Sequence, residues 1–224
     1  MSTSFQRHVA LFGGAFNPPH LGHREAIQGL RTNPGVARVV AVPSRGTPLK
    51  TVDTSYEDRL EMAKIAFEGV AEVSDLEGRE TLTYTWELLE RTRELGENRA
   101  FVIGADQFTG FRSWKRFPEV LSMCDWIVLL RKPASMDTVS GMIRALQTEG
   151  VLDGSGDPME WRVRGRSQGS QGKERVIRFV ETPAREISST RIRENFALGK
   201  KNENKAWISP AVMEWIERKH LYGT

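Results

Sequence analysis

Residues 8–31 read HVALFGGAFNPPHLGHREAIQGLR, and this stretch decides the fold. The short run 8–12 predicts a buried strand, and a turn rich in glycine and proline follows it. The spacing of apolar residues over about 21–31 then predicts a helix. A strand that passes through a short turn into a helix is the repeating unit of α/β folds with a parallel sheet.

The rest of the chain continues this alternation of strand and helix patterns. Strands are expected at 36–42, 70–73, 99–103, 126–130 and 176–180. Helices are expected at 85–95, 136–148, 188–198 and 210–220. Thr54-Ser55-Tyr56-Glu57 resembles a capping box that opens a further helix, whose apolar positions are Leu60, Ala63, Ile65 and Phe67. The sequence thus predicts one domain, 1–224, with a Rossmann-like, doubly wound parallel sheet in 1–182 and C-terminal helices in 183–224.

The segment 152–173 interrupts this rhythm, since it is rich in Gly, Ser and Gln and has no period. We expect a loop insertion there, which is long for a compact domain. Its basic residues are Arg162, Arg164, Arg166 and Lys173. A solvated surface excursion, a lid over an anionic ligand and a subunit contact, to which Trp161 points, all stay open.

Composition is that of an ordinary globular enzyme, with 39% hydrophobic and 27% charged residues. The net charge of +3 favours phosphorylated ligands but does not indicate nucleic-acid binding. The single cysteine, Cys124, excludes an internal disulfide, and its apolar neighbours predict a buried thiol. No stretch approaches the roughly 18 apolar residues of a membrane span. We therefore expect a cytoplasmic protein without nucleic-acid or membrane partners, and a homo-oligomer is left open.

The turn after the first strand carries the chemistry. Gly13 and Gly14 allow backbone to approach a phosphate closely, and the following helix start supplies N–H groups and partial positive charge. His20 and His23 are three residues apart, so at a helix start they share one face. Two imidazoles there can donate hydrogen bonds to the charge that develops on a phosphorus under attack. Zinc is the less favoured use, because the pattern offers no matching third ligand.

The stretch from Gly13 to His23 resembles the HxGH-type signature of the nucleotidyltransferase superfamily. A second superfamily element resembles Ile187-Ser188-Ser189-Thr190-Arg191-Ile192-Arg193. Its hydroxyls and N–H groups lie at an expected helix start, and Arg193 follows one turn later, so a second anion site could hold the β- and γ-phosphates of ATP. A plain N-cap is the alternative for these hydroxyls. Apart from 152–173, the whole chain resembles the bacterial nicotinate-nucleotide adenylyltransferases.

This resemblance implies roles for residues outside the two helix starts. Gly104-Ala105-Asp106 is similar to the family's Gly-x-Asp, which faces the nucleotide ribose, although Asp106 could instead cap the next turn. Trp114 matches the tryptophan that stacks on the pyridine ring, with a core position as the alternative. Thr83-Tyr84-Thr85 and Lys115 resemble elements that read the nicotinate carboxylate. Lys50 takes roughly the place of a phosphate-binding basic residue, and Arg131 matches a family arginine.

The implied site residues fall into three sets. The catalytic set is His20, His23 and Arg193. ATP is expected to contact Gly13, Gly14, Ala15, Phe16, Gly104, Asp106, Ile187, Ser188, Ser189 and Thr190. The acceptor is expected to contact Asn17, Lys50, Thr83, Tyr84, Thr85, Trp114, Lys115 and Arg131.

Two departures from the family pattern stand out. Ala15 and Asn17 replace a small hydroxyl residue and an aspartate, so one negative charge near the phosphates is lost. Pro48-Leu49-Lys50 lacks the histidine that usually precedes the basic residue, which weakens the match of Lys50.

The resemblance implies a Mg²⁺-dependent transfer of AMP from ATP to nicotinic acid mononucleotide in NAD biosynthesis. Nicotinamide mononucleotide is the nearest alternative acceptor, because it differs only in amide versus carboxylate. Phosphopantetheine adenylyltransferases and cytidylyltransferases share the phosphate machinery, and a nucleotide-binding protein without turnover is the remaining alternative. A dehydrogenase is excluded, because no Gly-x-Gly-x-x-Gly follows a strand.

Overall fold

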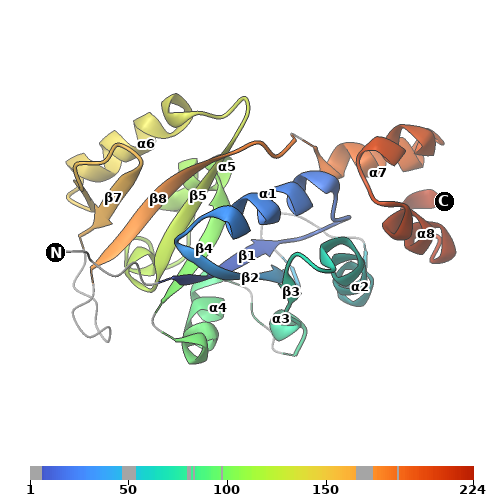
Figure 1. The fold of residues 1–224 in the computed structure, drawn as a ribbon, viewed down its shortest axis with the longest axis horizontal. Helices are drawn as coiled ribbons and strands as arrows, with labels where there is room; N and C mark the ends of the chain where they lie inside the picture. The colour runs from blue at the N-terminus through green and yellow to red at the C-terminus, as the bar shows by residue number, and fades with distance from the viewer. Residues whose placement is uncertain are drawn as a thin grey trace. The chain divides into compact units, whose positions relative to one another are not determined.

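The computed structural model describes residues 7–46, 54–79, 82, 84–96, 98–164, 174–185 and 187–224. Its strands are β1 (His8–Gly14), β2 (Val36–Pro43), β3 (Glu72–Val73), β4 (Arg99–Gly104), β5 (Asp125–Arg131), β6 (Leu152–Gly154), β7 (Glu160–Val163) and β8 (Arg175–Thr182). They form one sheet in the order β3-β2-β1-β4-β5-β8-β7-β6 (Figure 1). Pairing is parallel between β2 and β3, β4 and β5, and β5 and β8, and antiparallel among β6, β7 and β8. The expected α/β fold on a mainly parallel sheet is therefore confirmed.

The helices follow the strands along the chain. The α-helices are α1 (Leu21–Thr32), α2 (Tyr56–Phe67), α3 (Leu76–Arg79), α4 (Thr85–Arg91), α5 (Ala105–Thr109), α6 (Met136–Thr148), α7 (Ser189–Ala197) and α8 (Pro210–Arg218). The 3₁₀-helices are η1 (Thr92–Leu95), η2 (Phe111–Ser113), η3 (Glu119–Ser122), η4 (Lys201–Ala206) and η5 (Leu221–Gly223). Each helix expected from the apolar spacing is present, and 85–95 divides into α4 and η1.

The start of α2 differs in detail from the expected capping box. Ser55, rather than Thr54, is the N-cap, and its hydroxyl accepts a hydrogen bond from the Asp58 N–H at 3.0 Å. Asp58 lies in the first turn, where a carboxylate interacts favourably with the helix dipole.

The prediction of a loop insertion over 152–173 is wrong for its described part. Residues 152–154 and 160–163 form the antiparallel strands β6 and β7, with Trp161 opposite Ile177 of β8. Arg164 is ion-paired with Asp153, and the Arg162 Nε lies 3.6 Å from a carboxylate oxygen of Glu174. The described basic residues of this segment are thus matched by acids; Arg166 and Lys173 lie outside the described residues.

The chain forms two compact units, each assembled from separate stretches. The first unit comprises Met1–Leu11, Pro34–Ala37 and Tyr84–Pro183, and the second comprises Phe12–Asn33, Arg38–Thr83 and Ala184–Thr224. The strands β1 and β2 each contribute residues to both units.

An aromatic cluster forms the core of the first unit. Trp126 of β5 is fully buried and packs edge-on against Phe101 of β4 and against Phe111, with ring centroids 5.6 and 4.9 Å apart. Phe108 of α5 packs in the same way against Phe111 and Phe179. Figure 1 shows α4 and α6 on opposite sides of the strands β4 and β5.

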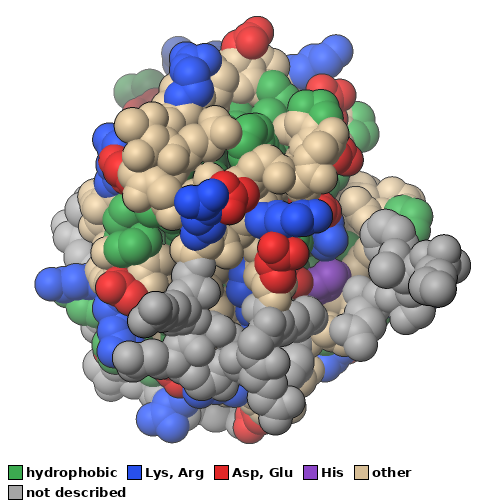
Figure 2. Space-filling model, turned by 90° about the vertical axis from the view of Figure 1, so that its left-hand side faces the viewer, with side chains coloured by type: hydrophobic (Ala, Val, Ile, Leu, Met, Phe, Trp, Pro, Cys, Tyr) green, Lys and Arg blue, Asp and Glu red, His purple; other side chains and the backbone are tan. Residues whose placement is uncertain are grey.

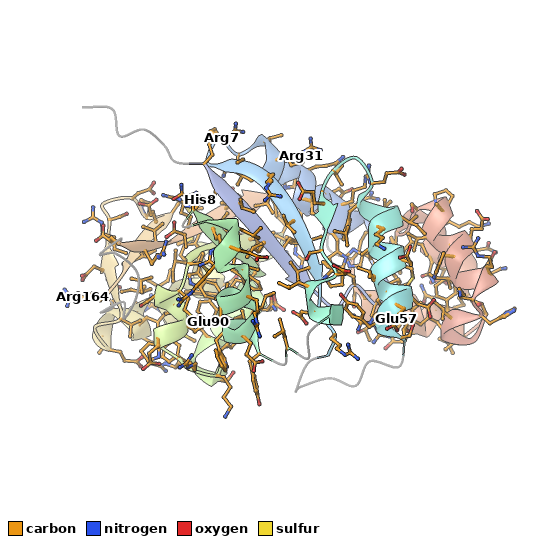
Figure 3. The ribbon with its side chains drawn as sticks, turned by 90° about the horizontal axis from the view of Figure 1, so that it is seen from below. Arg7, His8, Arg31, Glu57, Glu90 and Arg164 are labelled. Atoms are coloured by element: carbon orange, nitrogen blue, oxygen red, sulfur yellow. The ribbon has the colours of Figure 1, made fainter. Side chains whose placement is uncertain are left out.

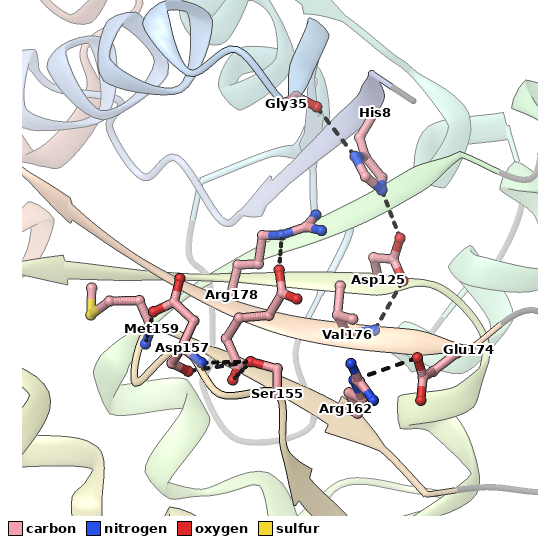
Figure 4. A network of polar contacts seen from close by, with 11 residues as sticks. His8, Gly35, Asp125, Ser155, Asp157, Met159, Arg162, Glu174, Val176 and Arg178 are labelled. Atoms are coloured by element: carbon pink, nitrogen blue, oxygen red, sulfur yellow. Dashed lines mark hydrogen bonds and ion pairs between the residues drawn. The ribbon is translucent and has the colours of Figure 1, made fainter. Parts of the chain in front are cut away.

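A buried polar network ties together the strand ends of the first unit (Figure 4). The His8 Nε2 lies 2.6 Å from Asp125 Oδ2, and its Nδ1 lies 3.2 Å from the Gly35 carbonyl oxygen. The Val176 N–H donates to the other oxygen of Asp125 at 3.1 Å. Arg7 precedes His8 at the start of β1 (Figure 3) and donates to the Val36 carbonyl at 3.0 Å. The position of His8 is therefore explained by structure and needs no metal.

The charged surface mixes both signs. Figure 2 shows Lys and Arg side chains interspersed with Asp and Glu side chains on one face of the molecule. This distribution agrees with the small net charge of +3.

Apolar packing in the second unit surrounds the glycine-rich turn. Phe16 is 2% exposed and lies edge-on against Phe67 of α2, with ring centroids 5.1 Å apart. Ile27 and Leu30 of α1 and Met62 of α2 are also fully buried. The helices α7 and α8 both contact η5, which packs on this unit with its residues partly exposed.

Candidate active site

The glycine-rich turn has a strained backbone that packing holds in place. Phe16 has φ +47°, in the left-handed region that bulky residues rarely adopt. Its ring stacks on Phe12 at 5.9 Å and meets His23 edge-on at 5.2 Å. A Cβ at Gly14 would lie 2.8 Å from the Phe16 ring, so only glycine fits beside it. The need for glycine at position 14 is therefore steric, in addition to any approach of phosphate.

The two signature histidines cap α1 reciprocally. The His20 Nδ1 accepts the His23 N–H at 3.3 Å, and the His23 Nδ1 accepts the His20 N–H at 3.2 Å. The rings stack with centroids 3.6 Å apart and an interplanar angle of 19°. Because Nδ1 is the acceptor in both rings, each neutral imidazole carries its proton on Nε2. The geometry thus makes both Nε2 atoms hydrogen-bond donors.

Gly22 lets a second stretch of backbone reach the start of α1. A Cβ at this position would lie 2.6 Å from the Arg185 carbonyl oxygen and 3.2 Å from the His20 Nδ1. Arg185 is held to α1 by Glu25, whose carboxylate accepts its N–H and its guanidinium, both at 2.8 Å. The hydrogen bond from the Arg185 side chain lowers the pKa of Glu25. The glycine between the histidines is therefore a packing requirement.

The second helix start lies directly against the first. Ser188 is the N-cap of α7. The Ser189 hydroxyl donates to the Pro18 carbonyl at 2.9 Å, and the Arg193 guanidinium donates to the Asn17 carbonyl at 2.8 Å. Arg193 also donates to the Thr190 hydroxyl at 3.4 Å. The structure thus brings together two motifs that are more than 160 residues apart in the sequence.

Arg59 organises the backbone around the turn, although it belongs to no motif that the sequence predicts. Its side chain is 1% exposed and donates to four carbonyl oxygens, those of Ala15, Ser44, Arg45 and Thr54. Burial lowers the pKa of this guanidinium. An arginine makes these bonds well because its planar fork carries five N–H groups.

The buried face of α2 coincides only in part with the apolar positions expected from the sequence. Its buried residues are Tyr56, Arg59, Met62, Ala63, Ala66 and Phe67. Of the four expected apolar positions, Ala63 and Phe67 are buried, whereas Leu60 and Ile65 are partly exposed. The signal that could have located Arg59 is its spacing of three and four residues from Tyr56 and Ala63, which places it on the buried face.

In the first unit, Gly104 is the last residue of β4 and the N-cap of α5, and Asp106 lies in the first turn of α5. A Cβ at Gly104 would lie 2.4 Å from the Asp106 Oδ1, so the carboxylate lies over the glycine backbone. The Gly104 N–H donates to the Gln107 side chain at 3.2 Å. The capping interaction at this helix start is thus made by Gln107 and not by the exposed Asp106.

Tyr84, Trp114 and Lys115 gather in the first unit. The Lys115 Nζ lies 5.8 Å above the centre of the Tyr84 ring. Trp114 is half-buried and meets Phe111 edge-on at 4.9 Å, so it is partly a core residue. Beside this pair, the Arg116 guanidinium lies 4.4 Å from the Trp86 ring, a contact that the sequence did not indicate.

The remaining expected residues have simpler positions. Thr85 is the first residue of α4, Arg131 is the half-buried last residue of β5, and Ile187 is buried before α7. Lys50 and Thr83 lie outside the described residues. Within the described ranges, no group of three or more His, Cys, Asp and Glu side chains is arranged to hold a metal ion. Likewise, none of the described helices is long and apolar enough to cross a membrane.

Comparison with known proteins agrees with this geometry. Residues 11–195 match the model of the Cytidylyltransferase-like family. Together with the α/β fold, this match places the protein among the nucleotidyltransferases.

Individual relatives indicate which kind of nucleotidyltransferase the chain resembles. "Probable nicotinate-nucleotide adenylyltransferase" of Serratia proteamaculans is 32% identical over 222 residues, covering 95% of this chain and 94% of the relative. The protein of the same name from Desulfatibacillum aliphaticivorans is 30% identical over 224 residues, covering 96% and 99% of the two chains. The chain belongs to the nicotinate-nucleotide adenylyltransferase family.

A solved structure supports the fold. "Plasmodium falciparum nicotinic acid mononucleotide adenylyltransferase complexed with NaAD" superposes with a TM-score of 0.72, covering 97% of this chain and 98% of that chain. The sequence identity is 19%, so this likeness concerns the fold.

Proposed function

We propose that this chain transfers the adenylyl group of ATP to nicotinic acid mononucleotide, giving deamido-NAD and pyrophosphate. The observation that carries the proposal is the direct contact of two anion-binding helix starts, through the Ser189–Pro18 and Arg193–Asn17 hydrogen bonds. The names of the relatives from Serratia proteamaculans and Desulfatibacillum aliphaticivorans support nicotinate mononucleotide as the acceptor.

The reaction needs positioning and charge neutralisation more than a general base. A phosphate monoester has its second pKa near about 6, so the acceptor is largely dianionic at neutral pH and can attack directly. Attack on the α-phosphorus in line with the leaving pyrophosphate requires no covalent enzyme intermediate. Donors that are already aligned lower the barrier, because they need no rearrangement as charge builds.

The phosphate groups are assigned to the second unit. The Nε2–H groups of His20 and His23 would donate to the oxygens around the α-phosphorus, and the 13–16 backbone would approach the same group. The hydroxyls and N–H groups of 188–190 would hold the β- and γ-phosphates, with Arg193 adding a positive charge. Ile187 would contribute backbone beside them.

For the ribose and the pyridine ring, the family resemblance supplies the candidate residues. Asp106, lying over Gly104, would accept hydrogen bonds from a sugar diol. Trp114 would stack on the pyridine ring, while 84–85 and Lys115 would face its carboxylate. Lys50, Thr83, Arg131 and Asn17 are proposed to contribute further contacts to the acceptor.

The ATP substrate is proposed to enter as its magnesium complex. Mg²⁺ prefers oxygen ligands and keeps several bound waters. Triphosphate oxygens and water can therefore be its ligands without a dedicated set of protein side chains. The single cysteine, Cys124, is a free and buried thiol, which fits a reducing compartment. We therefore propose the cytoplasm as the place of reaction.

A pyrophosphate-release assay with purified protein tests the proposal. ATP is combined separately with nicotinic acid mononucleotide, nicotinamide mononucleotide and phosphopantetheine. Release with the first acceptor and at least about tenfold less with the other two, a difference of about 1.4 kcal/mol in transition-state binding, is expected. Faster release with nicotinamide mononucleotide or with phosphopantetheine would show that the proposed acceptor is wrong. ATP binding without release in any mixture would identify a nucleotide-binding protein without turnover.

A further inference from the structure

The last residues of the chain reach the glycine-rich turn. Tyr222 lies in η5, and its ring stacks on that of Phe196 in α7, with centroids 5.9 Å apart and an angle of 24°. Its hydroxyl donates to the Asn17 Oδ1 at 2.6 Å. The Thr54 side chain hydrogen-bonds the same hydroxyl. The Tyr222 hydroxyl thus links Thr54 before α2 to Asn17 in the turn.

The backbone at this end of the chain is strained. His220 and Tyr222 have φ +50° and +61°, in the left-handed region that is unfavourable for bulky side chains. Such residues persist only where surrounding contacts compensate for their cost, and they concentrate at functional sites. For Tyr222 the compensating contacts are the ring stack on Phe196 and the hydrogen bond to Asn17.

The contacts of Asn17 show how its side-chain amide is oriented. Asn17 is 7% exposed, its main-chain oxygen accepts from Arg193, and its side-chain oxygen accepts from Tyr222. Because the Tyr222 hydroxyl donates to Oδ1, the Nδ2 end of the amide is turned away from Tyr222. Among the described residues, the Asn17 Nδ2 donates no hydrogen bond that matches those made by the Asn17 oxygens. The amide therefore keeps its two N–H donors available for a ligand.

We propose that Tyr222 is a positioning residue that orients Asn17, so that the Asn17 Nδ2 donates a hydrogen bond to a phosphate oxygen of the substrate. This proposal rests on the proposed function. The phosphate belongs either to ATP or to the mononucleotide, because both share this chemistry.

The proposal gives a physical meaning to the departure at position 17. The aspartate that is usual in the family can only accept hydrogen bonds and is negatively charged, so it would repel a phosphate in direct contact. Asparagine, oriented by Tyr222, reverses that polarity and joins the donors of His20 and Arg193. The substitution then retains a site for phosphate and is no sign of lost turnover.

A double-mutant cycle with N17A and Y222F tests the coupling. Dissociation constants for ATP and for nicotinic acid mononucleotide are measured by calorimetry, and KM and kcat are measured alongside. N17A and Y222F are each expected to weaken one of the two ligands by about tenfold, the effect of losing a hydrogen bond to a charged group. The double variant should be no weaker than N17A, because Tyr222 acts through Asn17. The ligand that weakens identifies the phosphate that is bound.

Two further variants separate orientation from general loosening. T54V removes a partner of Tyr222 but keeps the bond to Asn17, so binding should change by less than about threefold. N17D, close in shape to asparagine, should bind the same ligand at least about tenfold more weakly, because it places a negative charge where a donor stood. Additive effects of N17A and Y222F, equal losses in T54V and Y222F, or unchanged binding in N17D would each overturn the proposal.

The cycle also separates this proposal from the proposed function. If the unmodified protein releases no pyrophosphate with any acceptor, the reaction is wrong. The calorimetric cycle can then still find or exclude the Asn17–Tyr222 coupling for a bound phosphate. Thermal unfolding of each variant shows whether it folds, and a folded N17A that binds both ligands normally counts against the assignment.

Discussion

At the scale of single residues, His20 has two separable tasks. Its Nδ1 accepts the His23 N–H and caps α1, whereas its Nε2 carries the proton that we propose as the donor to the phosphate. Asparagine is also a good N-cap but has no group at the position of the imidazole Nε2. The two tasks can therefore be tested independently by substitution.

We expect H20A to lower kcat by about 10², the typical cost of losing one preorganised donor. It should also destabilise the fold by about 1 kcal/mol through the lost cap. H20N should show the same loss of kcat with near-normal stability. Steady-state kinetics and urea unfolding of both variants check this, and near-normal turnover in H20N would remove His20 from the chemistry.

Gly22 gives a second prediction at this scale. In G22A the new methyl group would lie 2.6 Å from the Arg185 carbonyl, so backbone must shift, at a cost of about 1–3 kcal/mol. Gly141 in α6 is the matched control, since a Cβ there meets nothing within 4 Å. G141A should leave stability unchanged or raise it by up to about 1 kcal/mol. Denaturant midpoints of the two variants are compared, and equal effects would contradict the steric reading.

At the scale of elements, Arg59 joins α2 to three segments of irregular backbone. Replacement by lysine keeps the charge but cannot reproduce donation to four carbonyl oxygens. We expect R59K to lower the free energy of unfolding by about 3 kcal/mol or more, because buried carbonyls lose charged partners. R24K serves as control, since Arg24 donates to only two carbonyls, at the partly exposed end of α2. A similar loss of unfolding free energy in both variants, measured by urea unfolding, would show that the Arg59 hydrogen bonds stabilise the fold no more than those of Arg24.

Elements with a strong periodic pattern were predictable from sequence. The helix expected at 136–148 coincides with α6, and the strand expected at 126–130 lies within β5. The strands β6 and β7 were missed because they are short and carry charged residues. The pairing of β7 with β8, and of β6 with β7, stabilises them rather than local propensity. The 152–173 pattern therefore looked like a loop.

The residues of the candidate site also differ in how well the sequence predicts them. The histidines and the hydroxyls of 188–190 lie at helix starts, which a local pattern can reveal. Arg59 and Tyr222 act on residues distant in the chain; the Tyr222–Asn17 bond spans 205 positions. Such contacts depend on the packing of whole helices. The sequence contains no local signal for the Tyr222 contact, and for Arg59 the helical spacing indicates only a place on the buried face of α2.

At the scale of the whole molecule, the Cys124 thiol and the Tyr222 hydroxyl predict sensitivity to alkali. Burial raises the pKa of the Cys124 thiol from 9.0 to about 12 and that of the Tyr222 hydroxyl from 10.0 to about 12. The unfolded chain releases both protons at lower pH than the folded chain does. The stability they contribute is therefore complete below about pH 9 and is lost as the pH rises toward 12.

We expect the free energy of unfolding to fall by several kcal/mol between about pH 9 and pH 12, because a difference of one in pKa between the folded and unfolded chain corresponds to about 1.4 kcal/mol. C124A should abolish the part of the decline that begins near pH 9, and Y222F the part that begins near pH 10. Urea titrations at stepped pH provide the measurement. A decline of unchanged shape in both variants would assign the sensitivity to other groups.

The antiparallel strands β6 and β7 have a consequence for how copies of this protein meet. The border strand β6 is three residues long, and its central residue is Asp153, ion-paired with Arg164. A strand at a sheet border offers its backbone to any passing chain, and short length with charge makes that template poor. Concentrated solutions should therefore resist the growth of intermolecular β-structure from this border.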